Sequence, residues 1–121
     1  MARGAVGTAR EKTAMTRGAI VWVNLEDAHP PELGKTRPAI VVSNTIQNEI
    51  LDTVVAVPLS TQPPEIWPLR LKLGTKIRNR QSFAIVPGIR QVDKTRLLDV
   101  AGHASADFMK RLSEAIDAYL G

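Results

Sequence analysis

The apolar residues of this chain are gathered in short segments, and this feature most limits how it can fold. Aliphatic and β-branched residues fill 19–25, 38–44 and 53–60, and each segment gives way to a turn rich in proline, glycine or charge. Segments of about four to eight such residues are typical of strands. Further strands are predicted at 66–73, 82–86, 89–92 and 97–101. Pro58 cannot donate to a strand ladder, so we expect an edge or a bulge there.

One amphipathic helix is predicted after Ser105, a residue type that caps helices. Every fourth residue that follows is apolar, which predicts a stripe facing the core: Phe108, Leu112, Ile116 and Leu120. A short helical turn is also expected at 45–52. Several short strands with one terminal helix predict a mainly β (α+β) fold, a small and strongly curved antiparallel barrel.

Length and composition indicate a single domain. The chain has 121 residues, of which 44% are hydrophobic, and this is enough for a core. It has no cysteine, which excludes disulfides and thiolate metal sites. No apolar run approaches the roughly 20 residues of a membrane helix, so we expect a cytoplasmic protein. Residues 1–16 lack periodicity and are expected to be a disordered arm or a leftover from cloning, with the folded domain at 17–121.

The net charge of +4 is unevenly distributed. Residues 69–96 carry eight basic side chains against Asp93, a net charge of +7, whereas residues 19–68 are acidic. A basic block inside a folded region favours an anionic partner, most often nucleic acid. A solvated basic face is the alternative explanation.

The step from Arg37 to Pro38 marks the entry to a buried strand. Proline holds the preceding residue in extended geometry, which fixes the backbone of Arg37. The link between the strands 38–44 and 53–60 is short, so they should pair, with residue 38 near residue 60. Arg37 and Ser60 then meet at one end of the sheet, where the long loop 26–36 also delivers Glu32. Arg37 could equally be a solvated arginine beside a core strand.

Other site types have less support. The chain has neither GxxxxGK[ST] nor GxGxxG, the glycine-rich loops that hold phosphates. His29 and His103 lack ligand spacing to each other or to acids, so no metal site is predicted. Ser60 has no histidine nearby in sequence, which weakens a hydrolase triad.

Four blocks of the sequence resemble the MazF/PemK family of toxin endoribonucleases. They are 17–23 (RGAIVWV), 32–44 (ELGKTRPAIVVSN), 57–62 (VPLSTQ) and 89–97 (IRQVDKTRL). The first is similar to the family's RGDIVWV and the last to its IRTIDKxRL, and the resemblance spans about 16–120. At three positions the chain departs from the family pattern, with Ala19 for an acid and with Leu33 and Gly88 for glutamines.

The resemblance implies an SH3-like barrel of the CcdB/PemK type, usually a homodimer, with a C-terminal helix. It implies the toxin of a type II toxin–antitoxin system, inhibited by a cognate antitoxin. The activity implied is sequence-specific cleavage of single-stranded RNA, that of an mRNA interferase needing no metal and no cofactor. The catalytic residues implied are Arg37, Ser60 and Glu32. RNA contacts are expected from Lys35, Thr36, Thr61, Arg78, Arg80 and Arg90.

RNA cleavage without metal uses the neighbouring 2′-OH as the nucleophile and leaves 2′,3′-cyclic phosphate and 5′-OH ends. Arg37 suits stabilisation of the phosphorane because a guanidinium stays charged and matches phosphate oxygens. Ser60 would orient the phosphate or relay a proton, and Glu32 would act as the base. Two alternatives remain: a CcdB-like poison of DNA gyrase on the same fold, and a non-catalytic RNA-binding barrel. The C-terminal sequence from Ala118 to Gly121 does not resemble a gyrase-binding tail.

Overall fold

The computed structural model describes residues 15–24 and 36–121. Within them lie seven strands, which are β1 (Ala19–Asn24), β2 (Thr36–Val41), β3 (Thr53–Ser60), β4 (Arg70–Lys72), β5 (Phe83–Ile85), β6 (Arg90–Asp93) and β7 (Leu97–His103). Two α-helices, α2 (Thr45–Ile50) and α3 (Ala106–Leu120), and two 3₁₀ turns, η1 (Val86–Gly88) and η2 (Lys94–Arg96), complete these elements. None of the helices in these residues is long and apolar enough to span a membrane.

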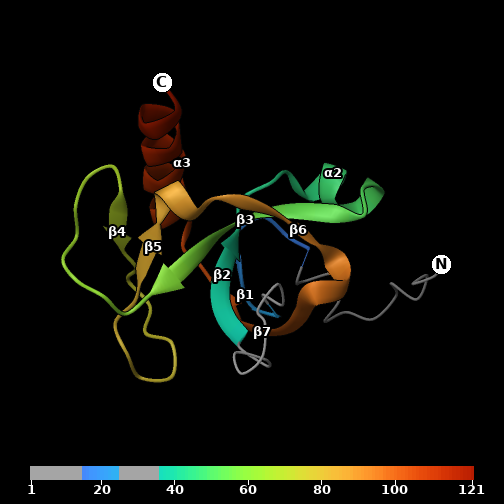
Figure 1. Ribbon diagram of the computed structural model, residues 1–121, viewed down its shortest axis with the longest axis horizontal. Helices are drawn as coiled ribbons and strands as arrows, with labels where there is room; N and C mark the ends of the chain where they lie inside the picture. The colour runs from blue at the N-terminus through green and yellow to red at the C-terminus, as the bar shows by residue number, and fades with distance from the viewer. Residues whose placement is uncertain (1–14, 25–35) are drawn as a thin grey trace, which may run out of the picture.

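The strands form one antiparallel sheet in the order β4-β5-β3-β2-β1-β7, and β6 pairs with the first half of β3. The ladder between β1 and β7 shifts register on either side of Val21, and such irregularities bend a sheet. Figure 1 shows the strongly curved sheet, with α3 beside β4 and β5 at one end and α2 at the other. The curved antiparallel sheet with a C-terminal helix is the fold that the sequence predicts.

β3 is the central strand, and it changes partner along its length. Its residues 53–56 pair with β6, and Leu59 and Ser60 pair with β5. Pro58 lies between these two ladders while it pairs with Ala39 of β2 on its other side. A residue without an N–H fits this gap in the hydrogen-bonding edge. The prediction of an edge or a bulge at Pro58 is therefore wrong, because β3 has partners on both sides and its ladder with β2 passes through Pro58 without a register shift.

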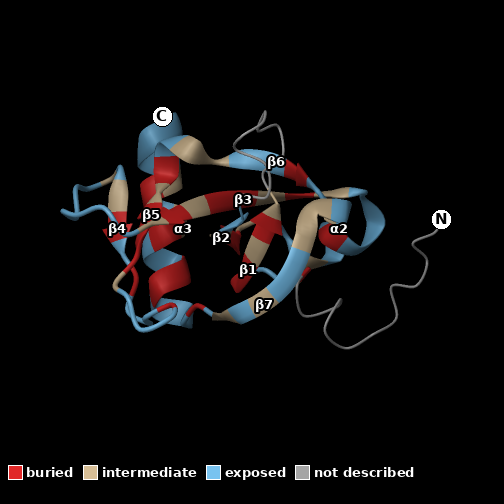
Figure 2. Cartoon of the chain, turned by 60° about the horizontal axis from the view of Figure 1, so that its bottom comes forward, coloured by how far each residue is buried: buried red, intermediate tan, exposed pale blue. Residues whose placement is uncertain are grey.

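The two faces of the sheet are packed differently. On one face, large residues such as Ile20, Ile40 and Leu71 pack against Phe108 and Leu112 of α3. The other face carries a cluster of smaller residues, mostly valine and alanine: Ala19, Val21, Val23, Ala39, Val41, Val54, Ala56 and Val92. In Figure 2 the buried segments lie on β1, β3 and the inner side of α3, whereas β7 is largely exposed.

A buried polar network fixes the start of the described chain. The buried side chain of Asn48 donates from Nδ2 to the carbonyls of Met15 (2.7 Å) and Ser43 (3.1 Å). The Ser43 hydroxyl donates to Asn48 Oδ1 and accepts from the N–H of Val55 at 2.8 Å. Met15 is itself buried, so the packed part of the molecule includes the residue two positions before the predicted domain start.

Three further details of the sequence prediction are wrong. The β2–β3 ladder pairs Ala39 with Pro58, one residue away from the predicted register. β2 ends at Val41 instead of continuing to Asn44, because the Asn44 side chain caps α2 by accepting from Ile46 N–H at 2.8 Å. The predicted strand 66–73 shrinks to β4, because Ile66 hydrogen-bonds Leu69 and Arg70 in a tight turn.

The helix prediction is confirmed with one exception. The Ser105 hydroxyl accepts from Phe108 N–H at 3.1 Å, as expected of an N-cap. Phe108 and Leu112 are buried, but Leu120 is 68% exposed, because the last turn of α3 extends beyond the sheet (Figure 1).

Candidate active site

Arg37 lies at the start of β2, opposite Val23 of β1. It is two residues from Ala39, so both side chains are on the face that carries the valine and alanine cluster. The side chain of Arg37 is exposed, and its guanidinium has no hydrogen bond or ion pair with another described residue. A rigid strand entry therefore holds a cation available to an anionic ligand.

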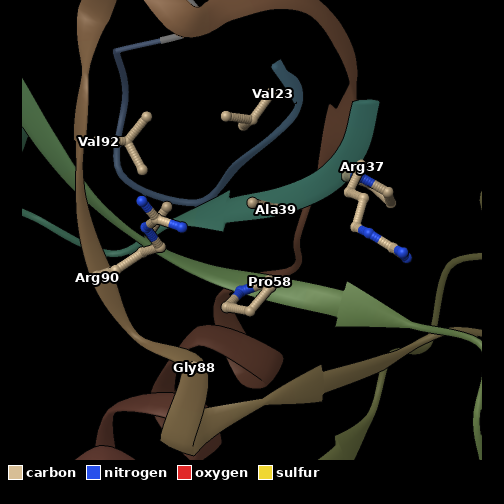
Figure 3. A pocket seen from close by; sticks show the side chains of 9 residues that line it. Val23, Arg37, Ala39, Pro58, Gly88, Arg90 and Val92 are labelled. Carbon is tan, nitrogen blue, oxygen red and sulfur yellow. The ribbon is translucent and has the colours of Figure 1, made fainter. Parts of the chain in front are cut away.

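A hollow of about 250 Å³ opens beside Arg37 on this face. Its walls are mostly apolar, and the residues around it are Val23, Arg37, Pro38, Ala39, Ala56, Pro58, Gly88, Arg90 and Val92. Figure 3 shows the Arg90 side chain at one side, near Val92, and the Arg37 side chain at the other side, directed outward. Two arginines from β2 and β6 thus flank a small apolar depression.

Small side chains create this hollow. Ala39 and Ala56 lie on neighbouring strands, and Gly88 approaches Pro58 so closely that a Cβ on Gly88 would lie 2.6 Å from Pro58 Cγ. A side chain at position 88 would have to displace the proline ring. Gly88, one of the departures from the family pattern, is therefore matched to Pro58 across the hollow.

Ser60 ends β3, where it pairs with Phe83 of β5. Its hydroxyl oxygen accepts from the N–H of Gln62 at 3.0 Å, which leaves the hydroxyl proton available to a ligand. The offset of the β2–β3 ladder, continued by two residues, places Arg37 opposite Ser60. No hydrogen bond joins the two side chains within the described part of the chain, and Ser60 does not line the hollow.

Of the other predicted site residues, the two threonines are described, and neither lines the hollow. Glu32 and Lys35 lie outside the described residues, as does His29. Thr36 pairs with Asn24 at the start of β2, and Thr61 follows β3; both are exposed.

Of the predicted basic contacts that the structure describes, Arg90 alone lines the hollow beside Arg37. Arg78 lies over the Trp22 ring, 4.0 Å from its centroid, and Arg80 is exposed in the same turn. Arg70, also in the basic block, donates to the Gln62 carbonyl at 3.0 Å. The block is therefore divided among several positions.

No described histidine reaches this site. His103 pairs with Ala19 at the opposite end of β1 from Val23, the partner of Arg37. Its ring covers Gly18, where an added Cβ would lie 2.7 Å from His103 Cε1. Within residues 15–24 and 36–121, no three His, Asp or Glu side chains are grouped so that they could hold a metal ion.

Among the acidic residues that the structure describes, Glu65 has the clearest electrostatic perturbation. Its pKa lies below its usual value of 4.5, chiefly because its carboxylate accepts from the N–H of Lys72 and also from Arg111. The contact with Arg111 of α3 measures 3.0 Å. This carboxylate joins the segment after β3 to the helix, away from the hollow.

Two residues at or near this site were not identified from the sequence as functional. The sequence predicts Trp22 as an ordinary strand residue, but its ring packs against the Arg78 guanidinium. Gly88 was noted only as a departure, and the contact that explains it comes from β3. The position of Trp22 opposite Pro38 comes from the β1–β2 ladder, so the sequence carried no signal for its role.

Comparison with known proteins identifies the family. Residues 16–120 match the family described as the PemK-like, MazF-like toxin of type II toxin–antitoxin systems. The chain belongs to this family. It is 30% identical over 113 residues to endoribonuclease MazF9 of Mycobacterium tuberculosis, a match that covers 88% of this chain and 96% of the relative. It is 27% identical over 107 residues to endoribonuclease EndoA of Bacillus subtilis, covering 86% and 92% of the two chains.

Solved structures show the same fold. MazF from Deinococcus radiodurans superposes with a TM-score of 0.71 at 22% identity, covering 88% of this chain and 96% of that one. A mycobacterial endoribonuclease in complex with its cognate antitoxin gives 0.73 at 24% identity, covering 88% and 94%. The predicted MazF/PemK family and barrel fold are confirmed. The predicted enzyme class, an endoribonuclease, is confirmed at the level of the family by the names of the relatives.

Proposed function

We propose that this MazF-like toxin cleaves single-stranded RNA at the phosphate held by Arg37, without a metal ion. The observation that carries the proposal is the exposed Arg37 guanidinium at the mouth of β2, beside a hollow that Arg90 flanks on the other side. The names of the curated relatives support RNA cleavage over the gyrase-poison alternative.

Arg37 stabilises the transition state. The 2′-oxygen attacks the adjacent phosphorus, and negative charge accumulates on the non-bridging oxygens of the phosphorane. A guanidinium donates two parallel hydrogen bonds to such oxygens and stays charged at any relevant pH. One well-placed donor of this kind contributes about 3–4 kcal/mol to transition-state stabilisation. Because it does not deprotonate, Arg37 cannot be the base.

Two further groups complete the proton transfers. Glu32 takes the proton of the 2′-OH as the P–O2′ bond forms. Ser60, whose hydroxyl proton is free for a ligand, donates to a phosphate oxygen and fixes its orientation. The P–O5′ bond then breaks while Arg37 stabilises the departing 5′-oxygen with a hydrogen bond. That oxygen takes a proton from solvent water and leaves as a 5′-OH, and Glu32 returns its proton to the solvent, so the proton balance closes. The other product end is a 2′,3′-cyclic phosphate.

Binding of the substrate uses phosphate attraction and unpaired bases. Lys35, Arg78, Arg80 and Arg90 attract the RNA backbone independently of its sequence. Thr36 and Thr61 flank Arg37 and Ser60 in the chain and supply hydroxyl groups to the same strand of RNA. Sequence-specific recognition requires bases that are splayed out of a helix, which restricts the substrate to single strands.

The toxin acts as a homodimer in the cytoplasm, where mRNA is accessible, and a cognate antitoxin blocks its site. Support for the antitoxin comes from the family description and from a solved mycobacterial relative that is in complex with its cognate antitoxin. A MazE–MazF structure from Deinococcus radiodurans, at 21% identity and a TM-score of 0.70, has the same fold.

The experiment is cleavage of a random single-stranded RNA pool in excess EDTA, with the ends mapped by sequencing. We expect cuts with 2′,3′-cyclic phosphate and 5′-OH ends, and a loss of at least about 100-fold in rate for Arg37→Ala. The fold of the variant is checked by circular dichroism. Uncut RNA, cleavage that needs a metal, or full activity of Arg37→Ala would overturn the proposal, and inhibition of gyrase supercoiling would support the alternative.

A further inference from the structure

A tight turn between β4 and β5 has an unusual backbone. Ile77 and Arg80 exchange two backbone hydrogen bonds of 3.0 Å, and the two residues between them have positive φ, 51° at Arg78 and 62° at Asn79. Asparagine tolerates this conformation, but arginine is a costly choice there because its Cβ crowds the backbone. The turn is anchored by Ile77, which is buried in the core. Strain of this kind is maintained where the placement of the side chain matters.

The turn places Arg78 on the Trp22 ring. The guanidinium carbon lies 4.0 Å from the ring centroid, a close cation–π contact. Trp22 is half-buried and packs against the core beneath, so the ring is held in place. Arg78 is exposed and has no ion pair or hydrogen bond with another described side chain. One face of the guanidinium is therefore covered by indole, and the other is open to solvent.

Trp22, which carries this stack, is one ladder position away from Arg37 in the β1–β2 ribbon. Trp22 pairs with Pro38, the residue after Arg37, across the β1–β2 ladder. Trp22 and Arg37 are on opposite faces of that ribbon. However, the β2–β3 ladder covers only Ala39 to Val41, so no strand pairing closes the sheet beside Arg37 and Pro38 on the β3 side. An RNA strand that contacts both side chains therefore has to pass around this edge of β2.

We propose that Arg78, held flat on Trp22, is a stacking platform for an unpaired nucleobase next to the phosphate bound by Arg37. The inference rests on the proposed function and adds a residue that positions the substrate strand. Guanidinium planes and aromatic rings are the surfaces on which single-stranded bases stack. Because Trp22 already holds the Arg78 side chain in place, that side chain loses little conformational freedom when a base stacks on it. The positive charge of Arg78 also favours the adjacent phosphate.

A charge-conserving exchange separates stacking from simple attraction. Binding is measured by fluorescence anisotropy with a random 2′-O-methyl RNA pool, which wild-type protein cannot cleave because the nucleophile is blocked. Lysine keeps the positive charge but lacks the planar guanidinium on which a base can stack. Arg78→Lys should therefore bind the RNA pool about tenfold more weakly. Arg111→Lys makes the same exchange at an exposed arginine of α3 and should bind like the wild type.

A second variant excludes a purely structural role. Arg78→Asn places a residue that accepts positive φ at the turn, so the melting temperature should be maintained while affinity falls as in Arg78→Lys. In a Trp67→Phe background Trp22 is the single remaining tryptophan. RNA should quench its emission saturably, and an abasic oligonucleotide of the same length should not.

The outcomes are distinguishable. Unchanged affinity in Arg78→Lys and Arg78→Asn, or equal binding of the abasic oligonucleotide, overturns the platform while cleavage lost in Arg37→Ala still supports the proposed function. A melting temperature that falls in parallel with affinity assigns Arg78 a structural role instead. Wild-type protein that neither binds nor cuts RNA overturns both proposals.

Discussion

The two faces of the sheet are built from different side chains and serve different purposes. The face under α3 is filled with isoleucine, leucine, phenylalanine and methionine and is closed by the helix. The other face is lined with valine and alanine and leaves a hollow of about 250 Å³ between Arg37 and Arg90. Large side chains bury more apolar area and contribute more stability, whereas small ones leave room for a ligand. We therefore expect changes on the first face to affect folding and changes on the second to affect cleavage.

The largest expected effect is on the helix-covered face. Leu112 is fully buried there, so Leu112→Ala should lower the free energy of unfolding by about 2–5 kcal/mol through lost burial and a residual cavity. Urea denaturation measures this change in the free energy of unfolding. Leu120 is on the same predicted stripe but is exposed, so Leu120→Ala should change stability by less than about 0.5 kcal/mol. Equal losses in the two variants would contradict the division between the faces.

The next effect tests the face that carries the proposed catalytic site. Ser60→Ala removes a hydroxyl donor from the phosphate and should lower the cleavage rate about 100-fold, with stability nearly unchanged. Ser60→Thr keeps the hydroxyl and should retain most of the activity. Single-turnover cleavage of the mapped RNA site measures both. A Ser60→Ala enzyme with wild-type rate would remove Ser60 from the mechanism and leave Arg37 as the sole described catalytic group.

A smaller effect is expected at the rim of the hollow. Gly88→Ala places a Cβ 2.6 Å from Pro58 Cγ, and the displacement this requires should cost about 1–3 kcal/mol. Gly74→Ala is the matched control, because no heavy atom lies within 4 Å of the added Cβ there. Thermal denaturation compares the two. If Gly88→Ala is as stable as Gly74→Ala, the contact with Pro58 does not determine the shape of the hollow.

The smallest effect concerns Glu65, which joins the segment after β3 to α3. Its folded-state pKa is lowered, so its contribution to stability is present above pH 4.5 and is lost as the pH falls through the lower folded-state pKa. Because the pair with Arg111 is largely exposed, we expect less than about 1 kcal/mol. Glu65→Gln should flatten this part of the stability profile between pH 3 and 5. A profile of Glu65→Gln identical to wild type would show that the pair contributes nothing.

Much of the fold could be predicted because local chemistry decides it. The strand 53–60 has the predicted bounds, and the Ser105 cap sets the start of α3. The prediction failed where two local preferences competed. Asn44 continues an apolar run, but its amide oxygen caps α2, and the cap ends the strand early. Pro68 and the turn at Ile66 shorten the strand predicted at 66–73, because the backbone hydrogen bonds there close locally.

The candidate site could be predicted only in part. Arg37 is identified by the adjacent proline and by family resemblance, and its position at the strand entry is as expected. The basic block at 69–96 predicts an anionic partner but not which charges act together. Of its arginines, one lies on Trp22, one donates to a backbone carbonyl and one borders the hollow. The number of charges in a segment does not tell where each of these side chains lies in the folded protein.

The sequence by itself determined the family, the strands, the capped helix and the arginine at the mouth of β2. These depend on side-chain type and short-range spacing, which are local properties of the chain. The tertiary structure alone decided the register of β2 on β3, the matching of Gly88 to Pro58 and the contact of Arg78 with Trp22. Each of these joins residues at least 15 positions apart in sequence, and only the packing of the curved sheet sets their distance.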